Sequence, residues 1–273
     1  METNVNNTFF TGKFLLHLPS VDSTNNYAKQ HIAKSSPIDG TVILADEQLA
    51  GRGQSGTVWL ADANKNLTFS IIYKTSFLRA TEQFYLSMAI SLGIKYAISS
   101  ILNTHNNDCV LPTELFNTKI KWPNDIYIDD KKLAGILIEN TISGMYLKYS
   151  VIGIGLNVNQ EDFLKEIKAT SLKLITENDV DKNIVLNKIL ESIEKYYFIL
   201  KERKFEQLKS EYLENLLNYN TIASYKKGES VFEGKIVDID AVGNLVMEIQ
   251  NGTDVLEEKF AFKEIAFLNK LEN

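Results

Sequence analysis

Two polar clusters, each following an apolar stretch, contain residue types that bind and activate anions. The first is the glycine-rich segment 46–56, which reads DEQLAGRGQSG and follows the apolar residues 41–45. The second runs from Lys121 to Lys132 and places Lys121, Asn124, Asp125 and Lys132 around the short apolar stretch 126–128. Cations offset the repulsion between anionic reactants, and phosphoryl transfer relies on such charge stabilisation. The pattern therefore indicates a pocket that handles phosphate, and an enzyme is our first hypothesis.

The segment Gly51–Gly56 matches the pattern G-x-G-x-x-G. A dinucleotide-binding loop opens directly into a helix and is followed about 20 residues later by an acidic residue, but Tyr73 and Lys74 stand there. A protein kinase needs H-R-D and D-F-G triplets, which this sequence lacks. A glycine-rich surface turn remains an alternative. Arg52 favours anion binding instead, because the glycines beside it let the backbone approach an anion.

Lys132 has two interpretations: a solvated charge of the turn at 129–130, or a lysine aimed at a ligand. In an extended strand, Lys132 and Ala134 point to the face opposite Leu133. Gly135 is unusual in a strand, where glycine often marks the close approach of a ligand or of backbone. We therefore expect Lys132 to lie over a floor left open by small side chains. The preceding segment WPND is typical of a simple turn, so a functional role for its aspartate depends on a real pocket.

The composition limits the class of protein. The chain has 273 residues, 44% of them hydrophobic, and a net charge of −6, which suits one large core and a small second one. An acidic balance disfavours nucleic-acid binding. The single cysteine, Cys109, suits a reducing cytosol, and we interpret it as a loop or buried thiol. No apolar run approaches the roughly 18 residues of a membrane span, and the first twelve residues lack a signal-peptide pattern. We expect a cytoplasmic protein without membrane contact.

The histidines and serines exclude two further classes. His17, His31 and His105 share no metal-ligand spacing, and the sequence has no G-x-S-x-G nucleophile elbow. We therefore expect no metal held by protein ligands and no serine hydrolase.

Apolar periodicity predicts alternating strands and helices up to about residue 220. We expect strands over 14–18, 41–48 and 67–74. Further strands, joined by tight turns at 129–130 and 143–144, are expected throughout 118–157. Helices are expected over 26–34, 81–103, 183–201 and 205–216, the first capped by side chains from 22–26. Residues 51–66 and 104–117 are expected to be connections. After Asn220, apolar and polar residues alternate between glycines, which indicates a small β-barrel of SH3-like size. We place the domains at 1–220 and 221–273.

Five blocks of the sequence, in order, resemble the biotin protein ligases. They are Asp22-Ser-Thr-Asn25, Gln48-x-x-Gly-Arg-Gly53, Lys121-Trp-Pro-Asn-Asp125, Lys132-Leu-Ala-Gly-Ile-Leu-Ile-Glu139 and Gly153-x-Gly-x-Asn157. The resemblance covers the chain from about Phe14 to its end. It implies an α+β fold, with a catalytic domain related to class II aminoacyl-tRNA synthetases, in which helices back a mixed sheet, and an SH3-like domain after it.

The resemblance also implies an activity with its substrates and partner. Biotin and ATP would form biotinyl-5′-AMP, with Mg²⁺ on the nucleotide. A specific lysine on the biotin carboxyl carrier protein of acetyl-CoA carboxylase, or of a related carboxylase, would then receive the biotin.

The resemblance implies roles for residues at the matching positions. The catalytic residues would be Lys132, Arg52 and Asp125, the last orienting or deprotonating the incoming lysine. Biotin would be bound by Ser23, Thr24, Asn25, Gln48, Gly51, Lys132 and Gly135. ATP and the adenylate would be bound by Arg52, Gly53, Trp59, Asn124, Lys132 and Asn157.

Two departures and two alternatives accompany the resemblance. Gln54 stands where many relatives have a second arginine, which puts tight retention of the adenylate in doubt. The first catalytic strand begins near Phe14, so we expect an enzyme without an N-terminal DNA-binding domain. A sheet-edge homodimer is a further expectation of the family. The alternatives are a lipoate-protein ligase and a non-catalytic protein that binds biotinyl-adenylate.

Overall fold

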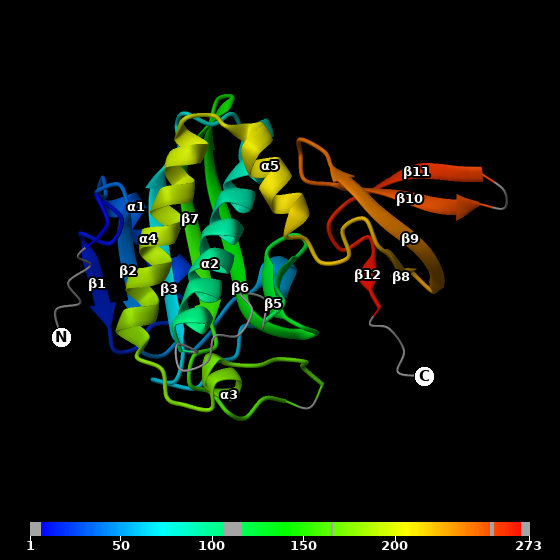
Figure 1. Cartoon of the computed structure of the whole chain (residues 1–273). Coiled ribbons are helices and arrows are strands. Elements are labelled where there is room, and N and C mark those ends of the chain that lie inside the picture. Colours follow the sequence, from blue (N-terminus) through cyan, green and yellow to red (C-terminus); the bar gives the residue numbers. More distant parts are fainter. Residues whose placement is uncertain (1–6, 106–115, 165, 252–253, 269–273) are drawn as a thin grey trace.

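The computed structural model describes residues 7–105, 116–164, 166–251 and 254–268. Figure 1 shows a larger unit, in which helices pack on a sheet, and a smaller sheet formed by the last part of the chain. Cys109 and most of the expected connection 104–117 lie outside the described residues.

The larger unit is built on a seven-stranded sheet with the order β1-β2-β3-β7-β6-β5-β4. β1 and β2 are parallel and every other neighbouring pair is antiparallel, so the predicted mixed sheet is confirmed. The strands are β1 (Leu15–Leu18), β2 (Thr41–Ala45), β3 (Leu67–Lys74), β4 (Thr118–Lys121), β5 (Asp125–Ile128), β6 (Lys131–Ser143) and β7 (Tyr146–Leu156).

Helices cover both faces of this sheet. They are α1 (Thr24–Lys34), α2 (Gln83–His105), α3 (Leu172–Thr176), α4 (Lys182–Lys201) and α5 (Phe205–Glu214), with short 3-10 turns at Gln54–Gly56 and Ala80–Glu82. Val42 and Leu44 of β2 belong to the main core under α2 and α4, whereas Ile43 between them packs with Ala28 of α1 in a second cluster. Because neighbouring strand residues point to opposite faces, α1 lies on the face opposite α2 and α4.

The start of α1 differs from the prediction. The helix begins at Thr24, and Ser23 at its N-cap makes no side-chain capping bond. Gln48 Oε1 instead accepts from the backbone N–H of Thr24 at 2.8 Å, and Asp22 accepts from the side chain of Asn26 at 2.7 Å. A residue distant in sequence therefore satisfies the first free helical donor, so the expected local side-chain capping was wrong.

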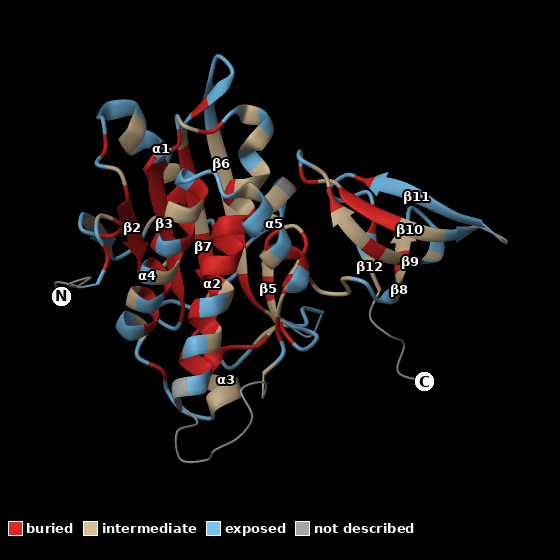
Figure 2. Ribbon diagram, turned by 45° about the horizontal axis from the view of Figure 1, so that its top comes forward, coloured by how far each residue is buried: buried red, intermediate tan, exposed pale blue. Residues whose placement is uncertain are grey.

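α2 is more apolar than we expected. Within the described residues, the helix spanning Ala80–Asn103 is long and apolar enough to cross a membrane, with a mean hydropathy of 1.4. Our statement that no run approaches that length was therefore wrong. However, 67% of its apolar 18-residue window is buried, and the helix packs against α4 in the main core. Figure 2 shows the same arrangement, with buried residues concentrated on α2 and the strands behind it.

The C-terminal residues form a five-stranded antiparallel sheet in the order β11-β10-β9-β8-β12. Its strands are β8 (Ile222–Lys227), β9 (Ser230–Ile239), β10 (Leu245–Asn251), β11 (Asp254–Phe260) and β12 (Ala266–Phe267). The predicted β-strand content is confirmed. Within the described chain, β11 and β12 are the two ends of the sheet and no ladder joins them, so the expected closed barrel is an open sheet. Among the described residues, the two-residue β12 pairs with β8 alone.

The two sheets are fixed to each other near the start of β5. Trp122 Nε1 donates to the carbonyl oxygen of Gly243 at 2.9 Å, and its ring meets Phe262 edge-on at 5.9 Å. Lys209 of α5 forms an ion pair with Asp238 of β9 at 2.8 Å. The smaller sheet thus packs beside the segment that we singled out for chemistry.

Candidate active site

A cavity of about 410 Å³ lies between the seven-stranded sheet, the loop after Gly51 and the C-terminal residues 262–267. The structure brings together most of the predicted site residues along its wall. They are Ser23, Thr24, Asn25, Gln48, Arg52, Gly53, Trp59, Asn124, Asp125, Lys132 and Gly135. Gly51 and Asn157 are absent from this lining.

Two glycines form the floor of the cavity. Gly135 of β6 and Gly155 of β7 are paired in register. A Cβ atom on Gly155 would overlap the indole of Trp59, and one on Gly135 would lie 3.2 Å from both Lys132 Nζ and the Trp59 ring. The missing side chains therefore leave the space that Trp59 and Lys132 occupy.

A β-bulge turns Lys132 toward this floor. Leu133 and Ala134 both belong to the main core, so the simple alternation that we expected was wrong. The register between β5 and β6 shifts at this point, which leaves Leu133 without a partner on β5. The extra residue places Lys132 on the same side of β6 as Gly135. Lys132 therefore lies over the floor that the two glycines leave open.

Lys132 is held on several sides. Its Nζ lies 2.8 Å from Asp125 Oδ2 and 5.7 Å from the centre of the Trp59 ring. Its backbone N–H donates to Lys168, and its carbonyl accepts from Thr170, at 2.9 and 3.0 Å. The amine is thus fixed at the cavity wall, with just over a quarter of its side chain exposed.

Lys121 is a second cation of the cavity, to which the sequence reading assigned no role. Its Nζ lies 3.4 Å from Tyr127 Oη and 5.4 Å from the centre of the Phe267 ring. Burial lowers the pKa of Lys121, and the charge of Lys132 adds to this, while Asp125 opposes it. Burial also raises the pKa of Tyr127 to about 12, so that its phenol is protonated at neutral pH.

Side-chain amides and hydroxyls line the other end of the cavity. Gln48 Oε1 accepts from both the backbone N–H and the hydroxyl of Thr24, at 2.8 and 3.0 Å. Ser70 Oγ lies 2.7 Å from Thr24 Oγ1 and from Asn25 Oδ1. Ser70 does not line the cavity but supports Thr24 and Asn25 from behind, and sequence reasoning missed it, although a serine within the apolar strand LTFSIIYK was a usable signal. Gly153 leaves room for Asn25, whose amide a Cβ atom there would overlap.

The loop after Gly51 folds back on itself. The backbone N–H of Gly53 donates to Thr57, and that of Trp59 donates to Gly51, at 2.7 and 3.0 Å. Gly51 supports this hairpin rather than the cavity wall, because a Cβ atom on it would overlap the carbonyl oxygen of Trp59. Trp59 Nε1 and Gln54 Oε1 are buried without a hydrogen-bond partner in the described part of the chain, and both residues line the cavity.

Asn157 lies outside the cavity lining and is 3% exposed. Its side chain donates to the carbonyl of Thr170 and its backbone N–H to that of Leu133, both at 3.0 Å. These bonds join the end of β7 to the segment that holds Lys132. Asn157 therefore supports the segment that holds Lys132.

Clustered metal ligands are absent from the described residues. No group of three or more histidine, cysteine, aspartate or glutamate side chains that could hold a metal ion occurs among the residues described. Cationic side chains of the cavity lining include Lys121, Lys132 and Arg52.

A mixed sheet with a glycine floor, an aromatic cover, an amide-lined end and a lysine–aspartate pair defines an enzyme that binds a small anionic molecule. A family model described as the biotin/lipoate A/B protein ligase family matches residues 17–157. The chain belongs to this family, which confirms the resemblance derived from the five sequence blocks.

Named relatives and solved structures agree with this assignment. A bifunctional ligase/repressor BirA from Bacillus spizizenii is 32% identical over 248 residues, which cover 88% of this chain and 71% of the relative. A biotin–[acetyl-CoA-carboxylase] ligase from Mycobacterium tuberculosis is 29% identical, over 86% of this chain and 83% of that protein. The biotin protein ligase from Aquifex aeolicus in complex with biotin and ATP superimposes with a TM-score of 0.70 and 30% identity, over 93% of this chain and 98% of that one.

Proposed function

We propose that the chain is a biotin protein ligase, which uses ATP to join biotin to a lysine of a biotin carboxyl carrier protein through biotinyl-5′-AMP. The observation that carries the proposal is the Lys132–Asp125 pair, held over a glycine floor and under Trp59 in one cavity. The family model covers biotin and lipoate ligases alike, and the relatives named as biotin ligases support the choice of biotin.

The amide-lined end of the cavity suits the head group of biotin. A ureido ring carries two N–H donors and one carbonyl acceptor, and each is costly to bury without a partner. Ser23, Thr24, Asn25 and Gln48 supply side-chain donors and acceptors at this end. The indole of Trp59, which lies over Gly135 and Gly155, would supply the apolar contact for the ring and chain.

The first step brings two anions together. A carboxylate oxygen of biotin forms a bond to the α-phosphorus of ATP, and the bond from that phosphorus to the pyrophosphate oxygen breaks. Lys132 would bridge carboxylate and phosphate, while Arg52 and Lys121 add positive charge from two other sides. Gly53, Trp59 and Asn124 complete the proposed adenylate contacts. Because Asn157 does not line the cavity, its proposed place is behind Lys132 and not against adenine.

In the second step, the amine of the carrier lysine attacks the acyl carbon of the adenylate, and the bond from that carbon to the phosphate oxygen breaks as AMP leaves. The amine must be neutral to attack and loses a proton as the amide forms. Asp125 becomes available for that proton once Lys132 has turned to the phosphate.

We extend the proposal to the metal ion, the acceptor protein, the location and the assembly of the chain. Mg²⁺ would enter on the phosphate oxygens of ATP. The acceptor would be the carrier protein of acetyl-CoA carboxylase or of a related carboxylase. The protein would act in the cytoplasm, with a sheet-edge homodimer as its proposed assembly.

The test is transfer to a carrier domain. The chain is incubated with ATP, Mg²⁺, a purified biotin carboxyl carrier domain and either biotin or lipoate, and the mass of the carrier is measured. A carrier whose target lysine is replaced by arginine is the control. Modification with biotin alone, at that lysine, is the expected result. Modification with lipoate alone would move the chain to the lipoate branch, and none with either would favour a binding protein.

A further inference from the structure

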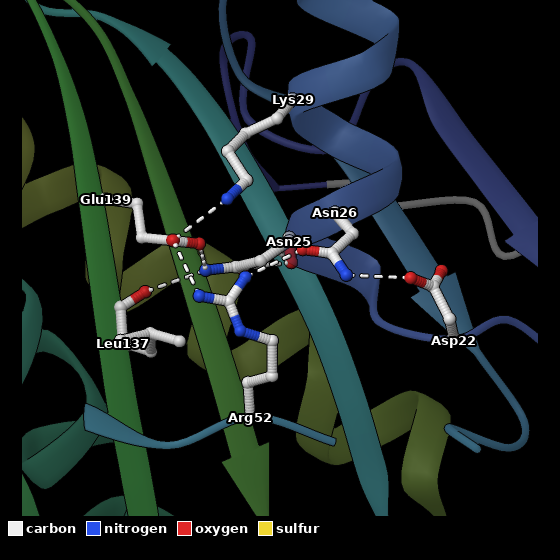
Figure 3. Close-up of polar contacts among 8 residues, drawn as sticks. Asp22, Asn25, Asn26, Lys29, Arg52, Leu137 and Glu139 are labelled. Carbon is white, nitrogen blue, oxygen red and sulfur yellow. Dashed lines mark hydrogen bonds and ion pairs between the residues drawn. The ribbon is translucent and has the colours of Figure 1, made fainter. Parts of the chain in front are cut away.

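Glu139, near the outer end of the cavity on β6, lies where three elements meet (Figure 3). Its Oε1 accepts from Lys29 Nζ of α1 at 2.9 Å and from a terminal nitrogen of Arg52 at 3.2 Å. Its Oε2 accepts from the side-chain amide of Asn25 at 2.9 Å. Glu139 itself is absent from the cavity lining, two residues beyond the lining residue Leu137.

The Arg52 guanidinium is clamped between this carboxylate and α1. Its other terminal nitrogen donates to Asn26 Oδ1 at 2.7 Å, and Asn26 in turn donates to Asp22 at 2.7 Å. Figure 3 shows the guanidinium between the strand that carries Glu139 and the start of the helix. Both terminal nitrogens of Arg52 are therefore held by groups outside the cavity lining.

Two parts of the cavity depend on this carboxylate. Arg52 begins the hairpin whose backbone bonds position Trp59 over the glycine floor, so a clamp on Arg52 also holds the indole. The Asn25 amide donates to Glu139 and to the carbonyl of Leu137, which leaves its oxygen facing Ser70. The Glu139 side chain thus orients the Asn25 amide and holds the hairpin that carries Trp59.

We propose that Glu139 is a positioning residue, which fastens the 51–59 hairpin over the cavity and sets the orientation of the Asn25 amide. Exposed ion pairs contribute little on their own. This carboxylate is different because its side chain is 23% exposed and accepts from three donors, two on α1 and one on the hairpin. The role in biotin binding rests on the proposed function, whereas the clamp on the hairpin does not.

The clamp is tested first without substrates, by trypsin cleavage after Arg52, followed by mass spectrometry of the peptide that ends there. In Glu139→Gln the side chain still accepts from Asn25 but no longer attracts Lys29 and Arg52. We expect cleavage about tenfold faster than in the wild type, as for the loss of a hydrogen bond between charged groups. Asn26→Ala removes the other anchor and should have the same effect. Glu202→Gln, in an exposed ion pair with Lys204, is the control.

The second measurement is the KM for biotin in a biotin-dependent assay. Glu139→Gln should raise this KM by about tenfold and lower kcat less, because the Asn25 amide and the hairpin loosen while Lys132 and Asp125 keep their places. Unchanged cleavage after Arg52 in both Glu139→Gln and Asn26→Ala would overturn the clamp. A wild-type protein without biotin-dependent activity would overturn the proposed function, and the cleavage assay would still decide the clamp.

Discussion

The amine of Lys132 lies 2.8 Å from the carboxylate of Asp125, on the adjacent strands β6 and β5. The bulge at Leu133 makes this pairing possible, since regular alternation would turn Lys132 away from the side of Gly135. Lys132 supplies a positive charge that can meet both the carboxylate and the phosphate. Asp125 supplies a base that can take a proton from the attacking amine. Separate steps of the reaction therefore depend on the two residues in different ways.

The substitution Asp125→Asn should separate these steps. An asparagine side chain keeps the shape of the aspartate but takes up no proton, so transfer to the carrier lysine should slow by about 100-fold. Formation of the adenylate should change far less, because Lys132 and Arg52 remain. Single-turnover transfer and pyrophosphate exchange, measured on the same variant, check this. Equal losses in the two assays would contradict a role in the second step.

Gly155→Ala should displace Trp59. Its methyl group would overlap the indole, and overpacking of this kind typically costs about 2 kcal/mol. We expect a lower free energy of unfolding and a higher KM for biotin. Gly135→Ala should be milder, since its new atom would meet the flexible end of Lys132 at 3.2 Å.

A second variant shows whether the indole is the cause. In a Trp59→Ala background, Gly155→Ala should cost little stability, because the indole that the methyl group would overlap is gone. A loss as large as in the wild-type background would show that the indole is not what the methyl group displaces.

Trp122→Phe tests the contact between the two sheets. Phenylalanine retains the ring next to Phe262 but loses the donor to the Gly243 carbonyl, which costs about 1 kcal/mol in the free energy of unfolding. Because residues 262–267 line the cavity, we also expect a higher KM for ATP. Tyr212→Phe, which loses a bond to Pro123 without touching the smaller sheet, is the control. An unchanged KM for ATP in Trp122→Phe would contradict the link between the sheets and the cavity.

Glu139 predicts a pH dependence of stability. Burial alone would raise the pKa of Glu139, but hydrogen bonds from Lys29 and Asn25, with the charges of Lys29 and Arg52, lower it below the ordinary 4.5. A carboxyl whose pKa is lower in the folded state stabilises the protein above its unfolded pKa, and this contribution is lost as pH falls through the folded pKa. The stability advantage of wild type over Glu139→Gln should thus be full at pH 7 and shrink below pH 4.5.

Chemical denaturation of both proteins across this range measures that difference. In a Lys29→Gln background the difference should be smaller, because one of the donors is gone. A difference that is constant with pH would contradict the assigned charge network.

Much of the fold follows from local patterns in the sequence. The alternation of buried strands and helical stripes predicted β3 and α4 closely, and the fold class, family and enzyme class are confirmed. The polar clusters after β2 and around β5 were expected to share a pocket, and Arg52, Asp125 and Lys132 line one cavity.

The remaining features depend on contacts between distant segments. The bulge at Leu133 is set by pairing with β5, and the free donor of Thr24 is satisfied from Gln48, so neither follows from local propensity. Phe267 enters the cavity through packing of the smaller sheet. The open sheet replaces a barrel because strand alternation predicts strands but not which edges pair.

The most direct test of the account is biotin-dependent ATP–pyrophosphate exchange in the wild type, in Lys132→Ala and in Lys131→Ala. Lys131 is the exposed neighbour and serves as the matched control. Lys132→Ala should fold normally and lose exchange by about a thousandfold, the scale for removing a group that stabilises transition-state charge. Lys131→Ala should match the wild type. Exchange by Lys132→Ala at the wild-type rate would contradict the central claim that this amine joins biotin and ATP.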